Sequence, residues 1–205
     1  MIESVNKRSP HQEADGYSII ELLIVAAVVI VLTAIAVFTL APQRRAYRTD
    51  DAMAQVANFL RDAYQRALSQ RQTMRVQIDR AKMLIIIIDE NKLPLGDEIE
   101  VRRAKLNDEI SVNQPTVGAG LLNPPPAPYN YSVAAYSNDL WEARFRSDGS
   151  VVDTAGNSMS ATVFFSLVNM KTSDANLIRA VTLFGPSGSI RVWRYTGQSF
   201  DAGAN

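Results

Sequence analysis

Cysteine is absent from this 205-residue chain, and histidine occurs once, at position 11. Without cysteine the chain forms no disulfide and offers neither a thiol nucleophile nor a thiolate metal ligand. Any catalytic or metal arrangement that depends on histidine would have to use His11, which precedes a long apolar run. The globular part must therefore be stabilised by packing.

The chain also has no formal net charge, because its 21 Lys and Arg residues balance its 21 Asp and Glu residues. The whole chain thus lacks the basic bias of nucleic-acid-binding proteins. No glycine-rich phosphate loop is present, and Asp148-Gly149 with Asp153 lacks the alternating ligands of a calcium loop. Adjacent carboxylates occur in predicted solvated turns, at Asp89-Glu90, Asp97-Glu98 and Asp108-Glu109. We expect no enzyme, no metal and no cofactor.

The most informative feature is the junction between a polar leader, Met1–Asp15, and an apolar run that starts after Gly16-Tyr17. From Ile19 to Leu40 there are 22 residues, or about 33 Å of helix, against a hydrocarbon core of about 30 Å. Glu21 lies inside this run, and a carboxylate there costs several kcal/mol unless it is neutralised. An ordinary single-pass anchor with Glu21 near the headgroups is the simpler alternative.

Gly16 to Leu23, with Tyr17 and Glu21 at their spacing, resembles the class III signal of type IV prepilins and type II secretion pseudopilins. The resemblance implies that a prepilin peptidase cuts between Gly16 and Tyr17 and methylates the new N-terminus at Tyr17. It also implies that Glu21 pairs with the N-terminal amine of a neighbouring subunit. Tyr17 departs from the phenylalanine that is usual in the family.

Elementary electrostatics is compatible with that pairing. A free Tyr17 amine would have a pKa of about 8 and carry a positive charge. Glu21 follows one helical turn later, so it can neutralise an amine of its own chain or of an adjacent one, and a buried charge is tolerable when paired. A cleavable secretory signal would not begin its apolar region with Glu and would end in small residues. If the leader is removed, His11 goes with it.

Beyond the run, Pro42 predicts a kink or a break in the helix. The pattern then favours a helix from Arg44 to about Gln70, with an apolar stripe at Met53, Ala57, Leu60, Tyr64, Ala67 and Leu68. We expect this stripe to pack on the chain's own domain rather than on a partner.

The remainder predicts strands. Thr73–Asp79 alternates and pairs across Arg80–Lys82 with Met83–Ile88, a run short enough to be a strand buried on both faces. The other expected strands are Ile99–Leu106, Glu142–Arg146, Val151-Val152, Ala161–Val168, Leu177–Phe184 and Ser189–Tyr195. Residues 107–130 are interpreted as a surface connection, and Thr196–Asn205 as a fraying tail.

Within pilin-like proteins the chain is most similar to the GspH/FimT group of minor pilins and pseudopilins. The similarity is carried by Gly16–Leu23, Ala63–Arg71, Phe145–Gly149 and Val181–Val192. It implies an α+β fold in which a long N-terminal helix, membrane-spanning and then amphipathic, packs on a C-terminal antiparallel β domain. The expected segments are a leader at 1–16, a transmembrane and assembly helix at 17–41, an amphipathic helix at 42–72 and a β-rich domain at 73–205.

The resemblance implies a subunit that helps to initiate or cap a type II secretion pseudopilus or a type IV pilus. Its partners would be the prepilin peptidase, other pilin or pseudopilin subunits and inner-membrane lipid. Lys7 and Arg8 on one side of the span and Arg44, Arg45 and Arg48 on the other leave its orientation open by charge. The resemblance places the globular domain in the periplasm.

The alternative function is DNA capture for natural transformation, because some relatives bind nucleic acid through a glycine-arginine-x-arginine stretch in the last hairpin. Here that stretch begins Gly188-Ser189, so a serine stands where the motif has its first arginine. Arg191 and Arg194 are the candidate DNA-binding residues, and Trp193 and Tyr195 could stack on bases. Arg191 and Arg194 differ by an odd number, so a strand directs them to opposite faces. DNA binding typically needs several phosphate contacts.

Overall fold

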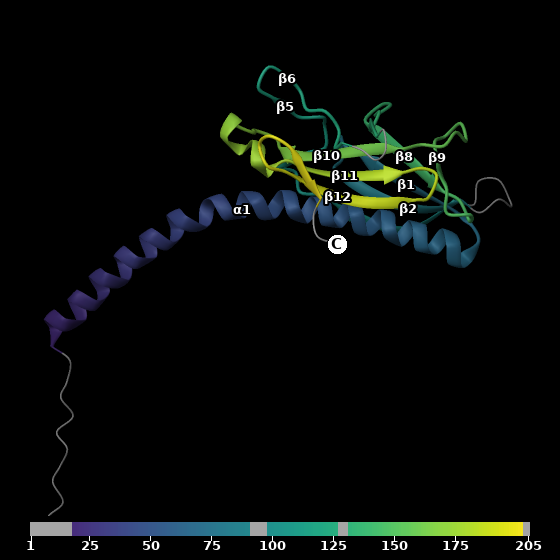
Figure 1. Ribbon diagram of the computed structural model, residues 1–205. Helices are drawn as coiled ribbons and strands as arrows, with labels where there is room; N and C mark the ends of the chain where they lie inside the picture. Colours follow the sequence, from purple (N-terminus) through teal and green to yellow (C-terminus); the bar gives the residue numbers. More distant parts are fainter. Residues whose placement is uncertain (1–17, 91–97, 127–130, 203–205) are drawn as a thin grey trace, which may run out of the picture. The chain divides into compact units, whose positions relative to one another are not determined.

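The computed structural model describes residues 18–90, 98–126 and 131–202, with the backbone alone for residues 38–42. A 52-residue helix, α1 (Ile19–Gln70), is followed by a domain of β-strands (Figure 1). This order confirms the predicted α+β class. The chain divides into two compact units, Met1–Pro42 and Gln43–Asn205, which are described separately.

The backbone of α1 is helical through residue 42, so the predicted alternative of a helix break at Pro42 is wrong. A proline inside a helix removes one backbone hydrogen bond and crowds the preceding turn, but long helices tolerate this locally.

The first sheet of the β domain has five antiparallel strands in the order β3-β2-β1-β8-β9. Its central hairpin joins β1 and β2, which confirms the predicted pairing, and Ile78 lies opposite Ile85. The strands are β1 (Thr73–Asp79), β2 (Leu84–Glu90), β3 (Ile99–Lys105), β8 (Leu140–Phe145) and β9 (Val151–Val152).

The second sheet runs in the order β13-β12-β11-β10-β4, and β7 pairs with β10 in parallel. Its members are β4 (Ile110–Ser111), β7 (Ser132–Val133), β10 (Ala161–Leu167), β11 (Arg179–Phe184), β12 (Ser189–Tyr195) and β13 (Phe200–Ala202). The small hairpin of β5 (Thr116–Val117) and β6 (Gly120–Leu121) and the 3₁₀ helix η1 (Thr172–Leu177) complete the described elements.

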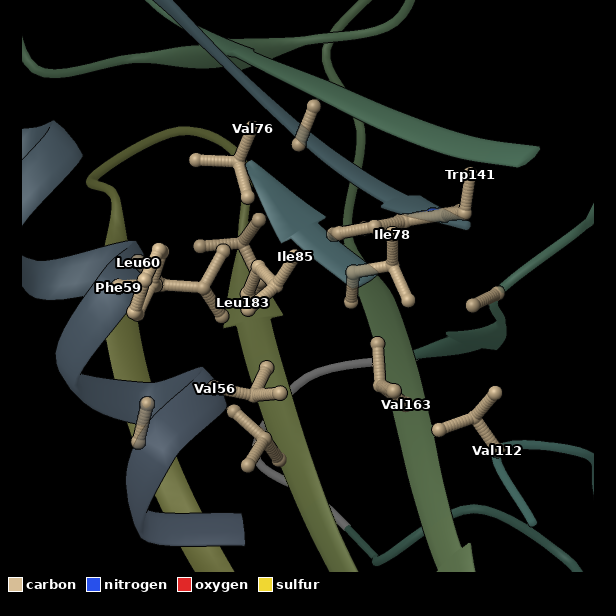
Figure 2. Close-up of a cluster of buried hydrophobic side chains, with 14 of the residues drawn as sticks. Val56, Phe59, Leu60, Val76, Ile78, Ile85, Val112, Trp141, Val163 and Leu183 are labelled. Atoms are coloured by element: carbon tan, nitrogen blue, oxygen red, sulfur yellow. The ribbon is translucent and has the colours of Figure 1, made fainter. Parts of the chain in front are cut away.

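The main core lies between the two sheets and the C-terminal half of α1. Figure 2 shows Val56, Phe59 and Leu60 of the helix in one cluster with Ile85 of the first sheet and Leu183 of the second. Burial of apolar surface on this scale is the dominant stabilising term for a chain without disulfides. A second cluster covers the other face of β10–β12 and contains Phe164, Ile178, Ala180, Trp193, Tyr195 and Phe200.

Several local expectations are corrected. Only alternate residues of β2 are fully buried, because Ile85 and Ile87 face the core while Ile86 and Ile88 are half-buried on the outer face. Leu68, expected in the buried stripe, is 41% exposed.

The C-terminal tail and the connection before β7 also differ from expectation. The tail does not fray up to residue 202, since β13 pairs with β12 and Phe200 is buried. Residues 107–126 are more than a surface connection, because Ile110 and Val112 enter the main core and Leu122 packs on the second cluster. The strand expected from Leu177 begins at Arg179, after η1.

Candidate functional site

The N-terminal end of α1 carries the candidate assembly site. The helix begins at Ile19, and Glu21 lies exposed in its first turn, where the backbone amide of Leu22 donates to the carbonyl of Ser18 at 3.1 Å. A carboxylate in this position interacts favourably with the unpaired amides at the helix start. Gly16 and Tyr17, the predicted cleavage and methylation residues, lie outside the described residues.

The segment Ile19–Val37 is long and apolar enough to cross a membrane, and none of it is buried within the chain. Ile19 is 82% exposed and Leu23 62%. Soluble monomers rarely expose an apolar surface of this extent, so it calls for lipid or another protein as its partner. Glu21 is the only charged residue in this segment.

The other polar side chain in the middle of the segment is satisfied internally. The hydroxyl of Thr33 donates to the carbonyl of Val29 at 2.7 Å, one turn earlier in the helix. This back-bonding removes a free hydroxyl from an apolar surface. Nothing in the sequence pattern, apart from the identity of the residue, predicts this contact.

The C-terminal half of α1 is fixed to the β domain by ion pairs as well as by the core. Asp50 accepts from Nε of Arg179 at 2.6 Å and lies 3.5 Å from Nε of Arg194. Arg179 is buried, and its Nη1 also donates to the carbonyls of Asn176 and Ile178. A buried guanidinium needs such partners. No sequence signal identified this contact, because Asp50 and Arg179 lie 129 positions apart.

A second polar link joins the helix to the edge strand β3. Asp62 accepts from Arg66 at 2.7 Å and from Arg102 at 3.1 Å, while the Arg102 guanidinium stacks 4.4 Å from the ring centre of Phe59. Burial raises the pKa of the Asp62 carboxyl, but the hydrogen bonds and charges of the two arginines outweigh it, so the pKa lies below its ordinary value.

Two turns of the β domain pack against the C-terminal end of α1. Gly149, after β8, and Gly188, before β12, both have left-handed backbones and pack against the ring of Tyr64. A Cβ at Gly188 would lie 2.5 Å from Cε2 of Tyr64 and 2.7 Å from the carbonyl oxygen of Gly149. Tyr64 in turn makes an edge-to-face contact with Phe145 at 6.4 Å. These contacts give a packing reason for both glycines.

The candidate DNA-binding arginines lie on opposite faces of β12, as the alternation predicts. Arg191 is exposed on the face of Trp193, whereas Arg194 shares the face of Val192 and contacts Asp50. Trp193 and Tyr195 belong to the second buried cluster, and the Trp193 indole N–H donates to Thr182 at 2.8 Å. Neither ring is free to stack on a base, and DNA binding by this hairpin stays an untested prediction.

Two of the carboxylate pairs meet at one guanidinium, because Glu90 and Glu98 both contact Arg75, but the described residues contain no group of three or more acidic side chains that could hold a metal ion. Asp89 and Glu90 belong to β2 rather than to a turn, and Glu90 contacts Arg75 and Arg144. Asp108 and Glu109 occupy the predicted turn, and Asp97 lies outside the described residues.

Comparisons with known proteins give one structural similarity. The chain is similar to the minor pseudopilin EpsH from the Type 2 Secretion System of Vibrio cholerae, with a TM-score of 0.47 and 13% sequence identity over 74% of this chain and 99% of that chain. No family model matches the sequence, and no curated protein matches it either.

Proposed function

We propose that this chain is a minor pilin or pseudopilin subunit that a prepilin peptidase cleaves between Gly16 and Tyr17. The observation that carries the proposal is the apolar segment Ile19–Val37, which has no buried residue, begins just after that junction and contains a single carboxylate, Glu21. Such a surface is costly in water, and the one carboxylate in it demands a cationic partner.

Before assembly, the segment spans the inner membrane once, with the β domain in the periplasm. After cleavage, Tyr17 becomes a methylated N-terminus whose amine remains cationic. Glu21 of one subunit neutralises the amine of its neighbour, and apolar surfaces that faced lipid now face other helices. The assembled subunit belongs to the initiation or tip complex of a type II secretion pseudopilus or a type IV pilus.

The test is the incorporation of a Glu21→Gln variant into filaments formed with the other subunits of its machine. Glutamine keeps the size of the side chain and removes the charge, so we expect cleavage to proceed and incorporation to fall at least tenfold. Asp51→Asn, which removes an exposed carboxylate further along the same helix, should incorporate normally. Equal incorporation of both variants would overturn the pairing.

A further inference from the structure

The turn before β8 has the geometry of a tight hairpin. Its central residues, Asn138 and Asp139, have left-handed backbones with φ of 49° and 64°. Ser137 and Leu140 exchange two backbone hydrogen bonds across the turn, at 2.9 and 3.0 Å. A two-residue hairpin with this backbone normally continues as a ladder of paired residues.

The ladder stops after this first pair, because the two arms of the hairpin belong to different sheets. The arm before the turn contains β7, which pairs with β10 of the second sheet, whereas β8 pairs with β1 of the first. Ala135 and Glu142 would be the next facing residues in a closed hairpin, but they are not paired with one another. The arms of the hairpin therefore diverge.

A groove of about 570 Å³ lies between the two arms. Val133 and Ala135 line it from one arm, and Trp141 and Glu142 line it from the other. Trp141 is part of the main core and lies beside Ile78 (Figure 2). The inner side of the groove is therefore apolar.

On β8, the backbone of Glu142 faces the groove. Successive residues of an antiparallel strand direct their amide and carbonyl to alternate edges. The amide of Arg146 donates to the carbonyl of Ser150 at 2.9 Å, on the edge next to β9, so Glu142, four residues earlier, faces that same edge. Because β9 pairs only with Arg144 and Phe145, no described strand covers the edge at Glu142.

On the other arm, the backbone of Ala135 faces away from its own sheet. The amide of Ala134 donates to the carbonyl of Thr162 in β10 at 2.9 Å. Ala135 therefore directs its amide and carbonyl to the opposite edge, where no described strand pairs with it. An open strand edge is a template for a further strand, and this groove has one on each side.

The charge of the groove indicates which kind of strand it accepts. Glu142 and Asp153 are the only charged residues in its described lining. Neither forms an ion pair with a described residue, since Glu142 accepts from a neutral side-chain amide and Asp153 from backbone amides of its own turn. Arg144 and Arg146 donate to carbonyls of that turn without lining the groove, and Arg144 is paired with Glu90. The lining thus complements a basic partner.

We propose that this groove binds an extended, basic segment of a different protein, which pairs as an added strand with the backbones of Glu142 and Ala135. Side chains of a strand alternate between its two faces, so one set packs inward on Trp141 and Met159 and the other carries Lys or Arg toward Glu142. The groove lies within the unit Gln43–Asn205, so the proposal depends on neither the cleavage nor the membrane span proposed above.

The experiment measures binding of fluorophore-labelled peptides to the full chain in a neutral detergent by fluorescence anisotropy. The probe is the pentapeptide Val-Lys-Val-Lys-Val with both ends blocked, and Val-Glu-Val-Glu-Val is compared with it. A third peptide carries N-methyl groups on the backbone amides of its two lysines, so that it keeps its charge but cannot donate along one edge. We expect saturable binding of the lysine peptide, at least tenfold weaker binding of the glutamate peptide, and loss of binding on N-methylation.

A pair of variants locates the binding site. Glu142→Gln keeps the size of the side chain and removes one charge of the groove, so it should weaken binding of the lysine peptide by about fivefold. Glu100→Gln is the matched control, because it removes the same charge from β3, at the opposite edge of the first sheet, and should leave the affinity unchanged. The comparison of methylated and unmethylated peptides uses the unaltered chain and needs no variant.

Several results would overturn the proposal. Absence of saturable binding would exclude a strand site, and equal binding of the N-methylated peptide would show adsorption by charge alone. Equal affinities of Glu142→Gln and the parent chain would place binding outside the groove. If the chain self-associates and the lysine peptide dissociates it, the occupant is a second copy rather than a different protein. None of these results bears on the processing of residues 1–16, so this proposal and the proposed function can fail separately.

Discussion

The two halves of α1 share one secondary structure and have opposite surroundings. Leu32, in the apolar segment, is 60% exposed, whereas Leu60 in the C-terminal half is completely buried in the main core. The β domain already covers the apolar face of the second half, so that face is structural. No described residue covers the first half, and its apolar surface remains available for lipid and for neighbouring subunits. The second half of the helix therefore serves the folding of the β domain, and the first half is left for assembly.

The largest effect should come from making the same substitution in both halves. Leu60→Ala leaves a cavity in the main core and should lower the free energy of unfolding of the β domain by about 3–5 kcal/mol. Leu32→Ala should change it by less than about 0.5 kcal/mol, because nothing in the domain packs on Leu32. Urea unfolding of the full chain in detergent measures both. Equal losses would refute the division of the helix into a structural and an assembly half.

A smaller effect is expected where the β domain closes on the end of the helix. Gly188→Ala combines a left-handed backbone with a clash against Tyr64 and the Gly149 backbone, and should cost about 3 kcal/mol. Gly118→Ala has the same φ of 63° and nothing within 4 Å of the added Cβ, so backbone strain alone should cost about 1 kcal/mol. Thermal unfolding of the two variants separates clash from strain. Similar losses would show that Tyr64 does not hold this turn.

The smallest expected effect concerns Asp62, which links the buried half of α1 to the edge strand β3. The folded state lowers the pKa of Asp62, so its contribution is present above the unfolded pKa of about 3.9 and is lost as the pH falls through the lower folded value. Asp62→Asn should therefore be less stable than the parent by about 0.5–1 kcal/mol at pH 7. The difference should begin to shrink as the pH falls below about 4 and should disappear once the pH is below the folded pKa. Denaturant titrations across this range measure it, and a difference that persists in acid would exclude the ion pairs as its source.

Much of this architecture follows from local sequence patterns. Thr73–Asp79 alternates strictly between polar and apolar residues, and the bounds predicted for it and for Ser189–Tyr195 agree with β1 and β12. The apolar run at the start of β2 is continuous and shows no alternation. The sequence therefore could not indicate whether one face of this strand is buried or both.

The elements that were missed are short or depend on distant partners. β13 has three residues, too few for a periodic signal, and it forms because Phe200 packs on Tyr195 and Phe164. The contact of Asp50 with Arg179 exists only once the helix and the second sheet are brought together. For the candidate site, sequence identified Glu21 through one carboxylate in an apolar run, while the roles of Gly16, Tyr17 and Glu21 remain predictions.

The most direct test of the proposed function is the intact mass of the chain recovered from a cell that has the pilus or secretion machinery. We predict the mass of residues 17–205 plus one methyl group on the Tyr17 amine, and we predict that Gly16→Ala is recovered as the full, unmethylated chain. A mature protein that retains residues 1–16, or normal processing of Gly16→Ala, would contradict the account.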